Sequence, residues 1–341
     1  MPLVTRVPAG YDTLTGEVKA WDYKELMNEE ILKPMKILVA TEKPFAKKAV
    51  DGIRAIFDKA GYQTVLLEKY TDKAQLLEAV ADVDAMIIRS DKVTAEVIAA
   101  ARNLKIVVRA GAGYDNVDLA AASAKGVVVM NTPGQNSNAV AELALAMMIF
   151  MSRNRFTPGT GSEIQGKTLA IHAYGNVGKL VGRKGKALGM NVIAYDPFIT
   201  DAAVFEKDGV EKVDSVEDLY SRADFLSLHI PATPQTVKSI GYDLMMSMPK
   251  GATLVNTARK EVIDEEGVMR AMTEREDLKY ITDIAPEAAA DMAEKFGKRF
   301  FATPKKMGAE TAEANINAGL AAASQIVDYF VNGNVKFQVN K

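Results

Sequence analysis

The stretch 168–197, TLAIHAYGNVGKLVGRKGKALGMNVIAYDP, constrains the fold more than any other part of this sequence. An apolar run, 169–172, leads into a turn in which Ala173, Gly175 and Gly178 follow the pattern A-x-G-x-x-G. A helical pattern opens at this turn, and a second apolar run, 191–195, ends in Asp196, about 20 residues beyond it. This spacing predicts a strand, a helix and a second strand, the repeating unit of parallel α/β sheets.

The same turn predicts half of a dinucleotide-binding site. Glycine lets the backbone approach a pyrophosphate, and a helix N-terminus offers it free N–H groups and the positive end of a dipole. An acid at the end of the second strand can bind the adenosine ribose. The candidate cofactor-binding residues in this stretch are Tyr174, Gly175, Asn176, Val177, Gly178, Asp196 and Pro197.

Two details of this unit can be checked in a structure. Ala173 stands where the pattern begins with a small residue, and we expect a negative φ there because a Cβ disfavours the left-handed region. Gly182 and Gly185 lie inside the helix, where each costs about 1 kcal/mol relative to alanine. We therefore expect close packing at both glycines.

Composition narrows the class of protein. The chain has 341 residues, 48% hydrophobic and 25% charged, as in a soluble globular protein of two domains. Its net charge of −2 gives no reason to expect nucleic acid or a membrane as partner. It shows neither a signal-peptide pattern nor an apolar run of about 18 residues, so we expect a cytoplasmic protein. With no cysteine and two histidines, we expect no metal centre.

The order of patterns predicts an α/β fold with two doubly wound parallel sheets. Residues 1–34 lack periodicity and are expected to be an N-terminal extension or an expression remnant; the alternative is a segment that packs on a partner subunit. From Met35, strands KILVA, TVLLE, AMIIRS, KIVVRAG and VVVMN alternate with helices at 45–60, 72–80 and 94–101. The second lobe adds strands DFLSLHI, ATLVNTA, KYITDI and RFFATP, with helices at 264–273 and 311–331.

Between the lobes, residues 138–150 are apolar almost all round, which predicts a helix buried between domains or subunits. Ligands of parallel sheets bind at the carboxyl ends of strands. The polar residues that follow the strands are mostly basic, so the substrate is expected to be an anion. They are Arg89, Ser90, Arg109, Asn131, Thr132, Arg259, Asp283, Lys305 and Lys306.

These strand-end segments resemble the D-2-hydroxyacid dehydrogenase family, and within it the short phosphoglycerate dehydrogenases. The resemblance rests on IIRSDKVT, VVRAGAGYDNVD, VMNTPGQNSNAVAEL, the glycine turn, DFLSLHIPAT, NTAR and ATPKKMGAET. It implies two Rossmann-like domains with the active site in the cleft between them. Residues 35–133 plus 311–341 would bind substrate, and 134–310 would bind NAD. It also implies a homodimer formed through 138–150 and, because the chain ends soon after its last helix, no C-terminal regulatory domain.

The resemblance assigns roles to a few residues. An arginine in the family motif N-x-A-R-G clamps the substrate carboxylate and matches Arg259. Most members use a histidine in T-P-H-I-G as acid and base, but this chain has Lys305 or Lys306 there, depending on the anchor from which one counts. We favour Lys306 slightly. The glutamate that assists the histidine is displaced by one residue, to Glu287, and the alternative is that both lysines are solvated and the enzyme is slow or inactive.

The remaining site residues are also carried over from the family. Three arginines match those of the phosphoglycerate members and favour 3-phosphoglycerate as substrate; with their neighbours, the expected substrate-binding residues are Arg89, Ser90, Arg109, Ala110, Gly111 and Arg153. The expected cofactor-binding residues include His229, Pro231, Thr257, Ala258, Asp283 and Gly308. His229 is expected to be mainly structural, and His172 a core histidine. Asp196 favours NAD over NADP because its charge would repel a 2′-phosphate.

The implied activity is oxidation of 3-phospho-D-glycerate by NAD, the first step of serine biosynthesis. Two alternatives remain open. One is an enzyme for another 2-hydroxy acid, such as a glyoxylate or hydroxypyruvate reductase. The other is a non-catalytic protein that senses NAD and has lost the histidine.

Overall fold

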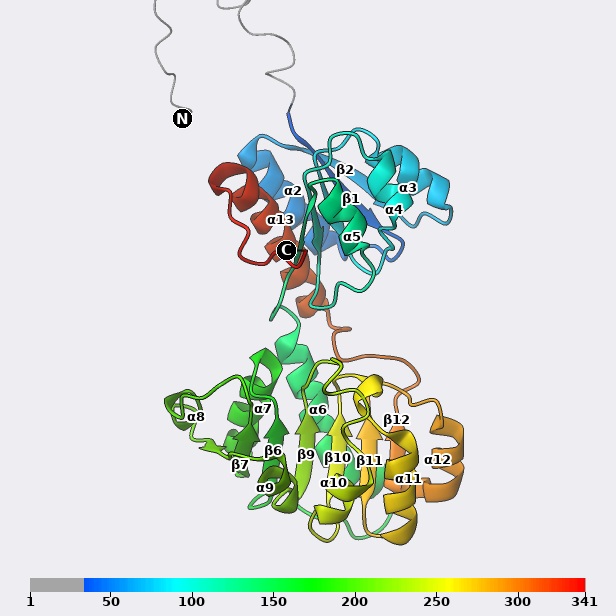
Figure 1. Ribbon diagram of the computed structural model, residues 1–341, viewed down its shortest axis with the longest axis vertical. Coiled ribbons are helices and arrows are strands. Elements are labelled where there is room, and N and C mark those ends of the chain that lie inside the picture. The colour runs from blue at the N-terminus through cyan, green and yellow to red at the C-terminus, as the bar shows by residue number, and fades with distance from the viewer. Residues whose placement is uncertain (1–33, 341) are drawn as a thin grey trace, which may run out of the picture.

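Two parallel sheets organise the chain, whose computed structural model describes residues 34–340. Each sheet is covered by helices and forms its own lobe, and the chain crosses between the lobes before α6 (Ser137–Ser152) and again before α13 (Ala312–Asn332) (Figure 1). The prediction for residues 1–34 concerns a segment that, apart from Pro34, lies outside the described residues. The prediction of two doubly wound parallel sheets is confirmed.

The first sheet has the strand order β2-β1-β3-β4-β5, all parallel. Its strands are β1 (Lys36–Thr41), β2 (Gln63–Glu68), β3 (Ala85–Ile88), β4 (Ile106–Arg109) and β5 (Val128–Asn131). On one face α2 (Lys47–Ala60) and α13 cover one set of apolar side chains. On the other face lie α3 (Lys73–Val80), α4 (Ala95–Ala100) and α5 (Leu119–Ala124). Alternate residues of each strand enter the two cores, as a sheet buried on both faces requires.

The second sheet has the order β12-β11-β10-β9-β6-β7-β8. Its strands are β6 (Thr168–His172), β7 (Asn191–Tyr195), β8 (Glu211–Lys212), β9 (Phe225–Leu228), β10 (Thr253–Asn256), β11 (Lys279–Thr282) and β12 (Phe300–Ala302). The order reverses between β6 and β9, the switch point at which such sheets bind ligands. Only the two-residue β8 is missing from the sequence-based prediction, since two residues show no periodicity.

Helices cover both faces of the second sheet. On one face lie α6, α7 (Asn176–Ala187) and α8 (Ala203–Glu206), and on the other α9 (Val216–Ser221), α10 (Tyr242–Ser247), α11 (Glu265–Glu274) and α12 (Ala289–Phe296). Short 3₁₀ turns are η2 (Asn154–Phe156), η3 (Lys260–Val262) and η4 (Gly297–Arg299). Within residues 34–340, no helix combines the length and hydropathy needed to cross a membrane.

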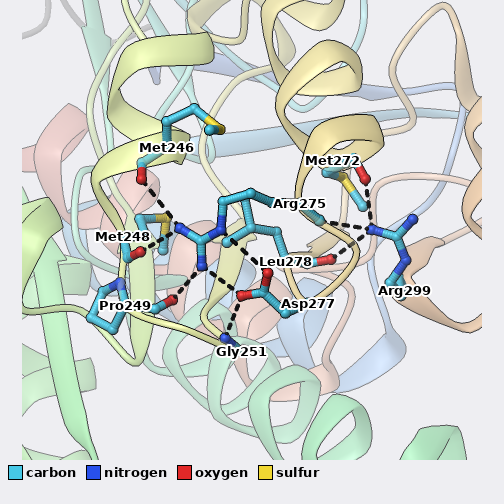
Figure 2. Close-up of polar contacts among 9 residues, drawn as sticks. All are labelled: Met246, Met248, Pro249, Gly251, Met272, Arg275, Asp277, Leu278 and Arg299. Atoms are coloured by element: carbon cyan, nitrogen blue, oxygen red, sulfur yellow. Dashed lines mark hydrogen bonds and ion pairs between the residues drawn. The ribbon is translucent and has the colours of Figure 1, made fainter.

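Two arginines close the end of the second sheet at which its strands begin. Arg275 donates to the carbonyls of Met246, Met248 and Pro249 and forms an ion pair with Asp277 (Figure 2). The hydrogen bonds that Arg275 and Gly251 N donate to the carboxylate of Asp277 hold its pKa at about 2. Arg299 donates to the carbonyls of Met272, Arg275 and Leu278. The two arginines thereby donate to carbonyl groups in the last turns of α10 and α11 and in the loops that follow these helices.

The segment after α13 returns to the free edge of β5. Val339 N donates to Val129 O at 2.9 Å, and the side chain of Asn340 continues the ladder. Its Oδ1 accepts from Val129 N at 2.8 Å, and its Nδ2 donates to Val127 O at 2.8 Å. Asn340 thus acts as one more peptide group and covers the edge of β5.

We expect Asn340→Ala to lower the free energy of unfolding by about 1–3 kcal/mol, because it leaves Val129 N and Val127 O without partners. Urea denaturation measures the loss. Lys336→Ala, in the same segment but exposed, is the control and should stay within about 0.5 kcal/mol. Equal effects of the two substitutions would contradict this role of Asn340.

The two histidines lie at the carboxyl ends of β6 and β9, where His172 is buried and His229 is half-buried. His172 is 7% exposed, with Nδ1 3.3 Å from the hydroxyl of Tyr220, and desolvation lowers its pKa to about 4. His229 lies beside Ser227, Nε2 to Oγ 2.9 Å, and desolvation lowers its pKa to about 3. The expectation that His172 is a core histidine is confirmed.

These lowered pKa values predict a loss of stability in acid. The unfolded state takes up a proton near pH 6.5 and the folded state only near pH 4, so stability is complete above 6.5 and falls as pH decreases. Between pH 7 and pH 5, the lowered pKa of His172 should reduce the free energy of unfolding by about 2 kcal/mol. Urea titrations at both values measure this, and His172→Gln should flatten the dependence. Parallel curves for the two proteins would contradict a neutral, buried His172.

Candidate active site

The glycine turn lies at the switch point of the second sheet, directly after β6. A Cβ on Gly178 would lie 2.2 Å from the carbonyl oxygen of Ala173, so the turn closes only with glycine at this position. A Cβ on Gly175 would meet nothing within 4 Å, which leaves free space above the turn. The first N–H groups of α7, from Asn176 and Val177 on, lack acceptors within the helix and lie at this space. The turn is therefore shaped to receive an anion.

The helix glycines have the packing reason that we expected. A Cβ on Gly185 would lie 2.5 Å from Cδ2 of Leu169, and one on Gly182 would lie 3.2 Å from Cδ1 of Ile171. Both neighbours belong to β6. The glycines thus bring α7 close to the strand that ends at the cleft.

The expected negative φ at Ala173 is wrong, because its φ is +79°. Ala173 N donates to Tyr195 O at 2.8 Å, so the residue still extends the ladder between β6 and β7. The Ala173 carbonyl must also point toward Gly178 for the turn to close. Ala173 meets both requirements, the ladder bond and the closure, in the left-handed region. The turn tolerates a strain of about 1 kcal/mol for this purpose.

Asp196 lies at the end of β7, facing the same turn. Its Oδ2 accepts from Tyr174 N at 2.9 Å and its Oδ1 from Phe198 N at 2.9 Å, so both oxygens are held in place. Pro197 lies between them, and Phe198 is 91% exposed. The ring of Tyr174 is buried, stacks on Phe205 at 4.7 Å and donates to Asp208, so Tyr174 offers the cleft only its backbone.

Residues after β9 and β10 border the other half of the switch point. His229 and Pro231 follow β9, and the Pro231 carbonyl accepts from Thr236 Oγ1. Thr257 and Ala258 follow β10, where Ala258 N donates to Asn256 Oδ1 at 2.9 Å. The Oγ1 of Thr257 is buried and has no hydrogen-bond partner among residues 34–340. This hydroxyl is available to a ligand.

The lysine loop, residues 303–308, is built around the carboxylate of Asp283. Asp283 is fully buried, and its Oδ1 accepts from Met307 N at 2.8 Å and from Thr303 Oγ1 at 3.0 Å. Its Oδ2 accepts from Gly308 N at 2.7 Å. A Cβ on Gly308 would lie 3.0 Å from this oxygen, which explains the glycine. Lys305 and Lys306 are therefore carried by a loop tied to the second sheet.

Lys305 and Lys306 are both exposed, and Lys306 lies near two arginines. Desolvation lowers its pKa, and the charges of Arg259 and Arg109 lower it further, whereas Asp283 and Asp115 act against the change. Arg259 directly follows the loop after β10, and its carbonyl accepts from Asn256 Nδ2 at 3.0 Å. Its Nη2 lies 3.8 Å from the Cβ position of Gly113 in the first lobe. Cations from both lobes, Lys306 and Arg259 from the second and Arg109 from the first, thus lie near one another.

Arg109, at the end of β4, is the cation that the first lobe contributes. Its Nε donates to Arg89 O at 3.1 Å, and burial lowers its pKa. A Cβ on Gly111 would lie 1.5 Å from Arg109 Nη1, so the guanidinium occupies the space that a side chain would take. Ala110, between them, is buried and donates to Ile88 O. This packing explains the glycine that the motif carries.

Three other candidate substrate-binding residues, Arg89, Ser90 and Arg153, stay predictions, and the structure shows their surroundings. The Arg89 guanidinium donates to Lys43 O and Pro44 O and to Asn315 of α13, so it holds its own lobe together, while the neighbouring Ser90 is exposed. Arg153 caps the C-terminus of α6, about 24 Å along the helix from Ser137, because each of the 16 residues rises 1.5 Å. The structure does not bring Arg153 to Arg109 within this chain.

Glu287 is also separate from the lysine loop. Its carboxylate pairs with Lys260 at 3.2 Å, and its side chain is 85% exposed.

Along α6, Asn138, Glu142 and Ala146 are exposed on one side, and the dimer contact expected there stays a prediction. Among residues 34–340, no three His, Cys, Asp or Glu side chains form a group that could hold a metal ion.

Sequence reasoning missed the polar residues that hold the site from behind. Asp91 and Asn116 are bonded to the backbone of Arg89, whose carbonyl accepts from Arg109, and Thr303 is bonded to the backbone of the lysine loop. Asp91 and Asn116 both lie inside motifs that supported the family resemblance. Their burial was the missing signal, because an aspartate after a strand reads equally well as a solvated turn residue.

Comparisons with known proteins agree with this geometry. A relative named D-3-phosphoglycerate dehydrogenase, from Methanocaldococcus jannaschii, is 39% identical over 272 residues, 74% of this chain and 51% of its own length. The chain spans about half the length of the first curated relatives that it matches. A hydroxypyruvate reductase from Thermotoga maritima is 34% identical over 76% of this chain and 88% of its own length.

A solved structure is more similar still. The crystal structure of cofactor (NAD+) bound 3-phosphoglycerate dehydrogenase in Entamoeba histolytica is 52% identical, with a TM-score of 0.81 over 91% of this chain and 99% of that one. The model of the D-isomer specific 2-hydroxyacid dehydrogenase catalytic domain matches residues 39–340. With this match, the two sheets and the motifs agree, and the chain belongs to the D-isomer specific 2-hydroxyacid dehydrogenase family.

Proposed function

We propose that this protein oxidises 3-phospho-D-glycerate with NAD, and that Lys306 is its acid and base. The observation that carries the proposal is the proximity of Lys306, Arg259 and Arg109, with the pKa of Lys306 lowered. Two of these cations come from the second lobe and one from the first. An anionic substrate between the lobes would neutralise them. The names of the relatives and of the 52% identical structure support this choice of substrate and cofactor.

The residues present fit NAD. Gly175 leaves open space at the N-terminus of α7, where a pyrophosphate would be bound, and the oxygens of Asp196 suit ribose hydroxyls. The unpartnered Oγ1 of Thr257 offers a further polar contact. Residues 197–199 after Asp196 include no arginine for a 2′-phosphate. When bound, NAD supplies the hydride acceptor.

The chain's own residues then orient the substrate and move its proton. Arg259 would bind the carboxylate through its guanidinium fork and polarise the oxygen on C2. The neutral Lys306 amine would take the hydroxyl proton at Nζ, which requires a pKa nearer to neutrality than that of a free lysine. Arg109 would bind the phosphate from the other lobe. Closure of the lobes would exclude water from these groups.

A second candidate is hydroxypyruvate reductase, favoured by the relative from Thermotoga maritima, of which the match covers 88%. A non-catalytic NAD-binding protein is the third. Absorbance at 340 nm, with NAD and 3-phosphoglycerate at alkaline pH, separates them. The proposal expects a higher kcat/KM for 3-phosphoglycerate than for glycerate. Equal values would overturn the substrate, and no NADH formation from either acid would overturn the activity.

For Lys306→Ala we expect kcat to fall by about 10²–10⁴-fold, the usual contribution of a general base. Lys305→Ala is the matched control and should keep its rate within about twofold. Because oxidation needs the neutral base, the rate falls as pH drops through its pKa. Lys306→His should therefore shift this acidic limb of the pH–rate profile to lower pH. Unchanged rates and limb in all Lys306 variants would refute the assignment.

We expect Arg259→Lys to lower kcat/KM for the acid by about 100-fold, because an ammonium cannot bind a carboxylate through two parallel hydrogen bonds. NAD affinity, measured by fluorescence titration, should stay within about twofold, since the guanidinium contacts only the substrate in this proposal. A loss confined to NAD affinity would show that Arg259 belongs to the cofactor site instead.

A further inference from the structure

The first lobe presents Arg109 to the cleft on a backbone support that involves no substrate contact. The carbonyl of Arg89 accepts from Arg109 Nε at 3.1 Å and from Asn116 Nδ2 at 3.2 Å. The guanidinium of Arg89 is already bound to Lys43 O and Pro44 O, so Arg89 serves Arg109 through its peptide group. The direction of the Arg109 side chain therefore depends on where this peptide lies.

A buried carboxylate fixes that peptide. Asp91 is 2% exposed, and its Oδ2 accepts from Arg89 N at 3.0 Å. Its Oδ1 accepts from Glu42 N at 2.7 Å and from the hydroxyl of Tyr70 at 2.8 Å. Three donors thus converge on two oxygens from three different segments. The Asp91 carbonyl in turn accepts from Asn116 Nδ2 at 2.6 Å.

We propose that Asp91 is a positioning residue, which holds the peptide of Arg89 so that its carbonyl aims the Arg109 guanidinium at the substrate anion. Both oxygens of the carboxylate accept from protein donors. Its charge also offsets the repulsion between Arg89 and Arg109, two cations that share this support. The inference rests on the proposed function only in taking the anion to be the substrate.

The two oxygens of Asp91 accept from different donors, so a substitution can test them separately. An amide at position 91 can keep its oxygen on Glu42 N and Tyr70, but its NH₂ group then faces the Arg89 N–H and cannot accept from it. Asp91→Asn therefore releases Arg89 selectively. Tyr70→Phe removes one donor from Oδ1 and leaves the Arg89 contact intact, so it is the matched control for lost stability.

The first measurement is steady-state kinetics with 3-phosphoglycerate. In Asp91→Asn we expect KM to rise by about fivefold or more with kcat within about twofold, because Arg109 supplies binding and not proton transfer. Tyr70→Phe should keep the wild-type KM, although both variants lose stability in urea. A wild-type KM in Asp91→Asn, or an equal rise in both variants, would overturn the inference.

The second measurement does not depend on turnover. Phenylglyoxal modifies free guanidinium groups, and tryptic mass spectrometry reads the rate at Arg109 in the intact, folded protein. We expect modification of Arg109 to accelerate in Asp91→Asn and not in Tyr70→Phe. If the wild-type protein fails to oxidise 3-phosphoglycerate, the proposed function fails while this result still decides the inference. Equal rates in all three proteins would overturn it.

Discussion

The buried carboxylate of Asp283 is the interaction on which the active-site geometry depends. It gathers Met307 N, Gly308 N and the Thr303 hydroxyl, and so fixes the loop that carries both lysines. That loop is also the second crossing between the lobes, because β12 precedes it and α13 follows it. Since Asp283 ties the loop to the second sheet as far as Gly308, the lysines belong to that sheet's lobe.

The two lobes use the same device for different cations. In the second lobe Asp283 follows β11 and holds the lysine loop; in the first, Asp91 follows β3 and holds the peptide that supports Arg109. In both cases an aspartate after a buried strand accepts hydrogen bonds from backbone N–H groups that the sheet leaves unpaired. A buried charge is costly without such partners, so each aspartate requires its loop to adopt one conformation.

Most of the fold was predictable because periodicity reports burial. Strands KILVA and TLAIH contain continuous apolar runs, 37–40 and 169–171, which indicate central strands covered on both faces. Gly182 and Gly185 were correctly expected to pack closely, since nothing else justifies glycine in a helix. The predicted sign of φ at Ala173 was wrong because two requirements set this angle, a ladder hydrogen bond to Tyr195 and closure of the turn over Gly178. Local conformational propensity reflects neither requirement.

By itself the sequence determined the two doubly wound sheets, the glycine turn and the cations available to the cleft, because these follow from period and local residue type. Only the tertiary structure decided which cations meet. In the folded protein the guanidinium of Arg89 donates to carbonyls of its own lobe, Arg153 lies at the C-terminal end of α6, and Glu287 pairs with Lys260. The reason is physical: a long side chain reaches several partners, and only packing across the fold selects among them.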